Sequence, residues 1–320
     1  MPNKDDTAMQ ETPGPGNLQV GIEVGRTKIT TVALDAAGEV VRAISEEVDT
    51  ADEPTAQIGK AVTKAHEVFG EQIALGVALP GLLKTGTGHI AFSGLIPEHS
   101  SVDLVAELRH YTDLEICFEN DANAAAYGEM VRGAGRGSND MFYVTLGEGV
   151  GGALILGRKL WRGASGFAGE FGYIAVNSEG MKLEDVASTA NIIRRTKNWF
   201  HQDPTSSLNT VGEDNIAIED VIRAAEKDDD FAQLMLQRTG MYVGAALAGV
   251  INLLNIETVI VGGEIMQAKH LVLKGIVRRA RELSFAPSFE AVTIVEGELG
   301  SNAGATGVAL LAGGGVGKAA

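Results

Sequence analysis

The chain has 320 residues, which is enough for two lobes or one large domain. Its formal net charge of −16 argues against a nucleic-acid surface, because such a surface needs clustered Lys and Arg to neutralise phosphates. The one cysteine, Cys117, can form neither an intramolecular disulfide nor a thiolate zinc cluster, so a reducing cytoplasm is the expected compartment.

The chain opens with a polar stretch and then shows the same strand pattern twice. Residues 1–17 are rich in polar residues, Pro and Gly, and they predict a disordered tail without a signal peptide. Residues 19–45 predict a β-strand, a glycine-containing turn and a second strand, and residues 141–163 repeat this pattern. One supersecondary unit used twice predicts two α/β lobes that face each other across a ligand-binding cleft.

The other segments alternate between predicted helices and strands. Helices are expected over residues 54–69, 102–111, 122–131, 184–199, 218–255 and 303–312. Strands are expected over residues 73–79, 114–118 and 257–261. The most apolar run, 243–254, is shorter than the roughly 20 residues that a membrane span needs, so it predicts a buried helix.

Seven motifs occur in the order and approximate spacing of a known family. They are GIEVGRTK (21–28), GVALPG (76–81), ENDANAAAYGE (119–129), VTLGEGVGGALILG (144–157), RGASGFAGEFGY (162–173), VIVGGEI (259–265) and GATGVALLA (304–312). From residue 18 to about residue 312 the chain therefore resembles the ROK sugar kinases of the actin/hexokinase/Hsp70-like superfamily. The resemblance implies an α/β, two-lobed actin-like ATPase fold, with ribonuclease H-like lobes and a central cleft. The implied N-terminal lobe takes residues 18–127 plus 302–320, and the C-terminal lobe takes residues 128–301.

The motif at 119–129 places an amide and a carboxylate after a predicted strand. A sugar hydroxyl is a poor nucleophile until a base takes its proton, and Asp121 matches the catalytic base of the family. Asn120 matches a sugar ligand, because an amide can both donate and accept hydrogen bonds. The alternative is that both residues cap the following helix.

The sugar-binding positions match the family only in part. Glu170 matches a glutamate that accepts hydrogen bonds from sugar hydroxyls, with glycines beside it that allow close backbone approach to a ligand, and Gly81 falls at the sugar as well. Tyr173 replaces a histidine that in relatives also binds a structural zinc together with a cysteine-rich loop. That loop is missing here, so we expect no zinc. Relatives also place an asparagine after the PG strand, whereas Ser93-Gly94 offer no amide, which puts a glucose-type substrate in doubt.

The phosphate loops depart from the family patterns D-x-G-G-T-K and L-G-T-G. Glu23 keeps a carboxylate but adds a methylene, Arg26 replaces a glycine, and Glu148 replaces a hydroxyl residue. We interpret Arg26 and Glu148 as a compensating pair across the cleft, and the alternative is that both point to solvent. ATP is expected at these three residues and at Gly25, Thr27, Lys28, Gly147, Gly149, Gly262 and Gly263, with Mg²⁺ near Glu23.

Two functions follow from these patterns. The first is ATP-dependent phosphorylation of a sugar hydroxyl, on a hexose or an amino sugar, by a cytoplasmic homodimer. The second is a ROK-like protein that binds a sugar or another small ligand, or serves as a partner subunit, without phosphoryl transfer. A DNA-binding repressor is not expected, because the residues before Gly21 are too few and too polar for a helix-turn-helix. Neither nucleic acid nor membrane is an expected partner.

Overall fold

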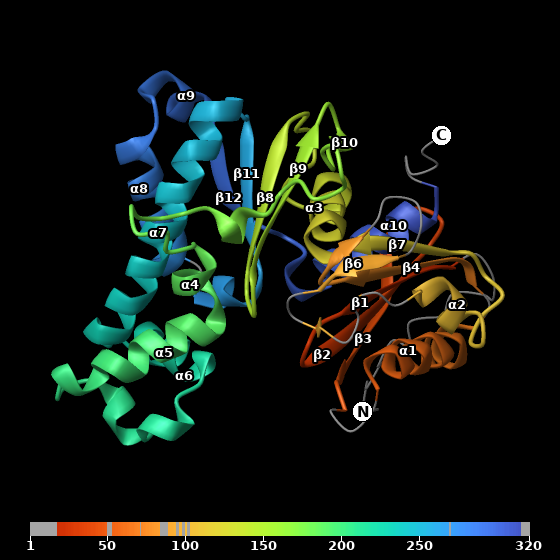
Figure 1. Ribbon diagram of the computed structural model, residues 1–320, viewed down its shortest axis with the longest axis horizontal. Helices are drawn as coiled ribbons and strands as arrows, with labels where there is room; N and C mark the ends of the chain where they lie inside the picture. The colour runs from red at the N-terminus through yellow and green to blue at the C-terminus, as the bar shows by residue number, and fades with distance from the viewer. Residues whose placement is uncertain are drawn as a thin grey trace, which may run out of the picture.

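The computed structural model describes residues 18–49, 53–70, 72–83, 89–93, 96–97, 100, 103–268 and 270–314. Two five-stranded sheets dominate this part of the chain, with the strand orders β3-β2-β1-β4-β7 and β10-β9-β8-β11-β12 (Figure 1). The predicted mixed α/β class is therefore confirmed. The tail predicted at residues 1–17 lies outside the described residues.

The first sheet is built around β1 (Leu18–Val24). This strand pairs antiparallel with β2 (Lys28–Leu34), which in turn pairs antiparallel with β3 (Val40–Glu47). On the other side of β1, β4 (Gln72–Leu79) and β7 (Ile116–Asn120) add in parallel. Most residues of β1, β2 and β4 are buried, as their nearly continuous apolar and β-branched sequences require.

The second sheet repeats the first. β8 (Met141–Leu146) pairs antiparallel with β9 (Val150–Leu156), and β9 pairs antiparallel with β10 (Lys159–Leu160). β11 (Thr258–Gly262) and β12 (Thr293–Glu296) then add in parallel beside β8. The order and the directions of all five strands match those of the first sheet, so the predicted repeated unit is confirmed. A short hairpin of β5 (Leu82–Leu83) and β6 (Ile90–Phe92) forms a separate two-stranded sheet that contacts β7.

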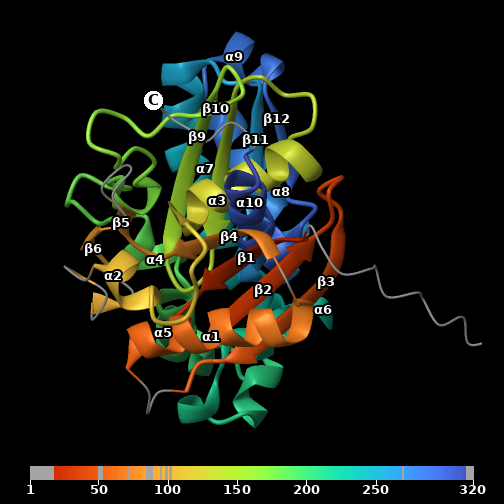
Figure 2. The ribbon, with the colours of Figure 1, turned by 90° about the vertical axis from the view of Figure 1, so that its right-hand side faces the viewer.

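Two helices cross between the sheets. α3 (Asp121–Arg132) follows the first sheet but packs on β8 and β9, whereas α10 (Ala303–Ala312) follows the second sheet but packs on β1 and β4. The two helices also pack on each other, and a Cβ at Gly307 would lie 1.7 Å from the carbonyl oxygen of Ala124. α1 (Pro54–Phe69) covers the face of the first sheet opposite α10 (Figure 2). The expected division of the chain into two lobes at residues 127 and 302 stays a prediction.

The remaining helices are short or pack around one long helix, α7 (Asp230–Leu254), which lies beside the second sheet. They are α2 (Leu104–Leu108) beside α1, and α4 (Glu184–Ala187), α5 (Thr189–Trp199), α6 (Ile218–Glu226), α8 (His270–Leu283) and α9 (Ala286–Ala291). Two predicted helices are each divided. Ser188 takes extended dihedral angles and separates α4 from α5, and Asp228, with φ of 62°, lies between α6 and α7.

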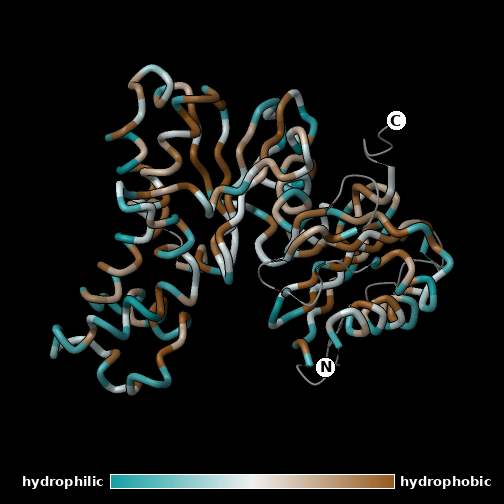
Figure 3. Tube along the Cα trace, viewed as in Figure 1, coloured by the Kyte–Doolittle hydropathy of each residue, from teal (hydrophilic) through white to brown (hydrophobic). Residues whose placement is uncertain are grey.

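The long helix α7 forms much of the core beside the second sheet. Its 25 residues have the length and mean hydropathy of a possible membrane span, but 56% of its most apolar window is buried within the protein, and a core helix meets the same criteria. Brown segments inside both lobes in Figure 3 mark the apolar strands and helices that form the core. The prediction of a buried helix holds for half of the residues in 243–254, whereas the end of this run is exposed, with Leu253 at 82%.

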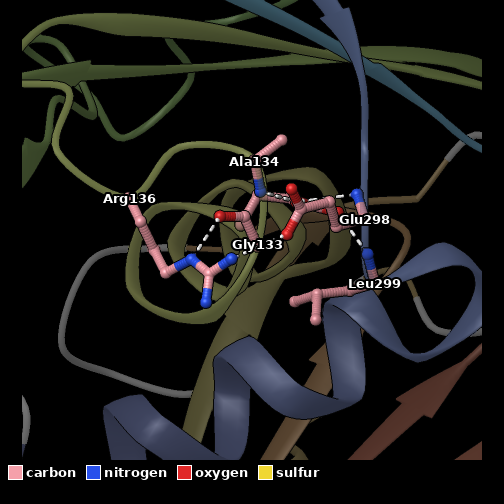
Figure 4. Close-up of polar contacts among 6 residues, drawn as sticks. Gly133, Ala134, Arg136, Glu298 and Leu299 are labelled. Atoms are coloured by element: carbon pink, nitrogen blue, oxygen red, sulfur yellow. Dashed lines mark hydrogen bonds and ion pairs between the residues drawn. The ribbon is translucent and has the colours of Figure 1, made fainter.

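A buried carboxylate anchors the far end of α3. Glu129 is 1% exposed and accepts hydrogen bonds from the backbone N–H groups of Ala134 at 2.8 Å, Glu298 at 3.1 Å and Leu299 at 2.9 Å (Figure 4). Arg136 adds an ion pair to Glu298 at 3.1 Å. These contacts fix α3 to the segment that leads from β12 into α10, so both crossing helices are held at one point.

Candidate active site

A cleft of about 1170 Å³ is lined by residues that belong to or follow strands of both sheets. It brings together nearly all of the residues expected at the site: Glu23, Gly25, Thr27, Lys28, Gly81, Asn120, Asp121, Gly147, Glu148, Gly149, Glu170, Tyr173, Gly262 and Gly263. Arg26 is the exception. Its side chain is 61% exposed and lies at the rim, outside the cleft lining.

Asn120 and Asp121 lie where β7 passes into α3. Asn120 caps the helix, because its Oδ1 accepts the backbone N–H of Asn123 at 3.1 Å. Its Nδ2 donates to the carbonyl oxygen of Gly81 at 3.2 Å and to Oδ1 of Asp121 at 2.9 Å. The capping alternative is therefore correct for Asn120, and capping leaves the Asp121 carboxylate in the cleft.

Two carboxyl groups of the cleft have strongly raised pKa values. Burial raises the pKa of Asp121 to about 6, and the nearby Glu170 carboxylate adds to this effect. Burial, followed by the charge of Asp121, raises the pKa of Glu23 to about 7. The longer side chain of Glu23 reaches the N-terminus of α10, where its Oε2 accepts the backbone N–H of Ala305 at 3.2 Å. A carboxyl group with a pKa of about 6 is mostly ionised at pH 7 and well placed to accept a proton.

Glu170 lies at the end of a loop that packs on β9. Partial burial and the neighbouring Glu184 carboxylate raise the pKa of Glu170. Gly169 has a φ of 100°, and a Cβ on it would lie 2.2 Å from the carbonyl oxygen of Gly152. The contact with β9 therefore requires a glycine here, and the expectation that this glycine also allows close approach to a ligand stays a prediction, although it lines the cleft. Tyr173 is 56% exposed in the cleft, with the ammonium of Lys182 3.8 Å from its ring centroid.

Ser93 offers the cleft no free polar group. The residue is 1% exposed, and its hydroxyl donates to the carbonyl oxygen of Pro80 and accepts the backbone N–H of Ile96 at 3.2 Å. The adjoining Gly94 lies outside the described residues. The hydroxyl of Ser93 thus serves the loop itself and does not replace the amide found in relatives.

The tips of the two strand hairpins meet across the cleft. The backbone N–H of Arg26 donates to Oε2 of Glu148 at 3.2 Å, and the Arg26 guanidinium Nε lies 3.7 Å from Oε1. The predicted pairing of the two side chains is confirmed, and the alternative that both point to solvent is wrong. Glu148 is held with its side chain only 20% exposed among the glycines expected at the phosphates.

Sequence reasoning missed an ion pair behind the cleft. Glu119 is 7% exposed in β7, and its Oε2 binds the guanidinium of Arg162, which follows β10 of the second sheet. The Arg162 Nε lies 3.1 Å from that oxygen. The available signal was a glutamate directly before the Asn-Asp pair in an otherwise apolar strand, because a buried carboxylate needs a partner.

No metal cluster is evident in the part of the chain that the structure describes, where no three or more His, Cys, Asp or Glu side chains are grouped to hold a metal ion. The expected absence of zinc stays a prediction. Cys117 is partly buried, and burial raises its thiol pKa to about 11. Glu23 fits a cation supplied with a ligand, because its buried carboxylate lies beside the Asp121 carboxylate, and the more exposed Lys28 offsets only part of their negative charge.

The repeated sheets and the cleft between them define a two-lobed actin-like ATPase fold, which is the fold of the structural neighbours. The ROK family profile matches residues 19–314, and the chain belongs to this family. The crystal structure of a ROK family glucokinase from Streptomyces griseus in complex with glucose and AMPPNP matches with a TM-score of 0.84 and 30% identity, over 92% of this chain and 99% of that one.

Relatives in sequence include both enzymes and regulators. A glucokinase of Halalkalibacterium halodurans is 31% identical over 306 residues, which cover 90% of this chain and 92% of the glucokinase. A xylose repressor of Bacillus subtilis is 27% identical over 306 residues, which cover 90% of this chain and 75% of the repressor. The relatives therefore support a ROK sugar kinase and keep a regulator without kinase activity as an alternative.

Proposed function

We propose that this protein is an ATP-dependent kinase that phosphorylates a hydroxyl group of a sugar. The observation that carries the proposal is the Asp121 carboxyl group, which lies in the cleft beside the Asn120 amide with a pKa of about 6. A base for this reaction has to be ionised near neutral pH and within reach of a bound hydroxyl. The glucokinase relatives support the proposal.

The sugar end of the proposed site combines carboxylate and amide side chains with the ring of Tyr173. Asp121 takes the proton of the attacking hydroxyl, while the Glu170 carboxylate and Asn120, through the second lone pair of its Oδ1, bind other hydroxyls. The carbonyl of Gly81 fixes the orientation of the Asn120 amide. Tyr173 supplies an exposed ring where relatives have a histidine, so the substrate is a hexose or amino sugar whose hydroxyl pattern suits fewer polar partners.

The nucleotide end is formed by the two hairpin turns. Gly25, Thr27 and Lys28 of the first turn and residues 147–149 of the second turn flank the ATP phosphates, with Gly262 and Gly263 beside them. When bound, Mg²⁺ and ATP supply the phosphoryl group and neutralise its developing charge. The buried carboxylate of Glu23 would be a ligand of that Mg²⁺ ion. The homodimer and the cytoplasmic location stay predictions.

The second candidate function is ligand binding without phosphoryl transfer. Glu148 places a negative charge where the triphosphate is expected, and its pairing with Arg26 ties the two hairpin tips together. The similarity to a xylose repressor favours the same alternative. In that case Asp121 and Glu170 bind a sugar whose hydroxyl is never phosphorylated.

Phosphoryl transfer from ATP and Mg²⁺ to a panel of hexoses and amino sugars, followed by ³¹P NMR, tests the proposal. Asp121→Asn is expected to lower turnover by about 10²- to 10⁴-fold and to leave sugar affinity nearly unchanged, because the amide keeps the shape but cannot take the proton. Equal losses of binding and turnover would identify Asp121 as a purely structural residue. Sugar binding by the unmodified protein with no phosphorylated product would favour the second function.

A further inference from the structure

The ion pair of Glu119 and Arg162 connects the two sheets immediately behind the cleft. Glu119 belongs to β7, the last strand of the first sheet, and Arg162 follows β10, the edge strand of the second. Both Nε and Nη2 of the arginine contact Oε2 of the glutamate. Glu119 is 7% exposed, so the interaction is shielded from solvent and from salt on the glutamate side.

Each partner is bonded to a segment that carries a side chain of the sugar end. Oε1 of Glu119 accepts the backbone N–H of Asn120 and the Nδ2 of Asn123, each at 3.0 Å, which fixes the turn into α3 where Asp121 begins the helix. The carbonyl oxygen of Arg162 accepts the backbone N–H of Ala168 at 3.0 Å. That bond closes the loop that leads to Glu170. The pair therefore links the segment of the expected base with the segment of the expected sugar-binding carboxylate.

Stability alone is a weak reason for such a pair. Removing two charges from water costs several kcal/mol, and apolar residues of the same volume often stabilise a protein as well or better. A planar guanidinium bound through two nitrogens does supply a defined orientation, which a single point charge on a lysine does not. The structure thus has a rigid, directional connection between two segments that otherwise belong to different sheets.

We propose that Glu119 and Arg162 are positioning residues that hold the Asp121 turn and the Glu170 loop at a fixed separation across the cleft. Neither lines the cleft, so they act through the segments to which they are bonded. The expected effect of the pair on sugar phosphorylation rests on the proposed kinase function. Its role in connecting the two segments does not. Since a misplacement of about 1 Å can cost about 100-fold in rate, the loss of this connection affects sugar use strongly.

The test compares Arg162→Met, Arg162→Lys, Glu119→Gln and the double variant Glu119→Gln/Arg162→Met with the unmodified protein. Glu39→Gln is the control, because Glu39 pairs with Arg132 at 2.6 Å on the surface, outside the cleft lining. We expect Arg162→Met to lower kcat/KM for the sugar by about 10- to 100-fold and to change the Kd of ATP by less than about two-fold. Arg162→Lys should recover part of the loss, and the double variant should lose no more than Arg162→Met, because the pair acts as a unit.

Amide hydrogen exchange of the unliganded proteins supplies a readout that needs no catalysis. Arg162→Met and Glu119→Gln should each speed exchange both in residues 119–123 and in residues 163–170, while residues 25–28 and 147–149 keep their rates. Equal losses of sugar and ATP binding with a lower Tm would indicate general destabilisation and overturn the proposal. If amide exchange becomes faster only in the segment that contains the substituted residue, the proposal is also overturned. If the unmodified protein transfers no phosphate, the kinase proposal fails, while the exchange of the two segments still decides the positioning role.

Discussion

The pairing of Arg26 with Glu148 predicts that the nucleotide site of this protein is partly closed by its own side chains. The perturbation is the double change Arg26→Gly with Glu148→Thr, which restores the residue types that the phosphate loops of relatives carry. The unmodified protein should bind ATP weakly, and the double variant should bind it at least about ten-fold more tightly, a gain of about 1.4 kcal/mol.

The magnitude follows from the charge of Glu148. Two like charges about 4 Å apart repel by about 4 kcal/mol at an effective dielectric constant of 20 and by about 1 kcal/mol in bulk water. The Glu148 side chain is 20% exposed, so its repulsion of a phosphate falls between these limits. Arg26 offsets only part of it, because its side chain is 61% exposed and pairs of this kind contribute about 0.2–1 kcal/mol. The removal of the Glu148 charge therefore accounts for most of the expected gain in ATP affinity.

The single variants separate the two effects. Arg26→Gly alone should weaken ATP binding by about two- to five-fold, because it leaves Glu148 without its cation. Glu148→Thr alone should strengthen ATP binding. Because Arg26 acts mainly by neutralising Glu148, Arg26→Gly should weaken binding only while Glu148 is present, and the two changes are therefore not additive. Isothermal titration with ATP and Mg²⁺ measures all four proteins. Glu46→Thr serves as the control, because Glu46 pairs with Lys64 away from the cleft lining.

One result would refute this reasoning. If the unmodified protein binds ATP and Mg²⁺ with micromolar affinity and the double variant binds more weakly, Arg26 is a phosphate ligand and the metal tolerates Glu148. The idea of a partly closed site would then be wrong, and the kinase proposal would gain support.

Three further predictions concern protons and metals. The pKa of about 6 at Asp121 predicts a kcat/KM that rises with pH through about 6, because only the carboxylate accepts the proton. A coupled assay from pH 5 to 8 measures it, and a flat profile contradicts it. The pKa of Glu23 is raised from 4.5 to about 7, so between these values the folded chain binds more protons than the unfolded chain, and the unfolding free energy of the ligand-free protein falls as pH rises through this window. Urea titrations should show this slope, and Glu23→Gln should reduce it, most clearly between pH 6 and 7, where Asp121 contributes least. Protein purified without a histidine tag should contain less than one zinc per several chains by elemental analysis, and stoichiometric zinc would show the argument from Cys117 and Tyr173 to be wrong.

Local patterns in the sequence were enough to predict the repeated strand hairpins, and the family resemblance predicted a set of site residues of which all but Arg26 line the cleft. Alternating and continuous apolar runs fix which segments become strands, and the turn residues fix where they reverse. The order of seven motifs placed Asp121, Glu170 and the two hairpin turns in one site, and the cleft lining contains all of them. The pairing of Arg26 with Glu148 was also predictable, because a positive and a negative residue each replace an uncharged residue of the family pattern in two turns that were expected to face each other.

The tertiary structure alone decided which distant groups meet. Glu23 accepts a hydrogen bond from Ala305, 282 residues away, and Glu129 accepts one from Leu299, 170 residues away. Such partners are backbone N–H groups, which every residue except proline carries, so no residue type in the sequence marks them. The exchange of α3 and α10 between the two sheets is likewise set by close packing of small residues on both helices at once. The hydrophobic pattern of a segment determines the secondary structure of that segment, whereas the partner of a buried carboxylate depends on where other segments lie in the folded protein.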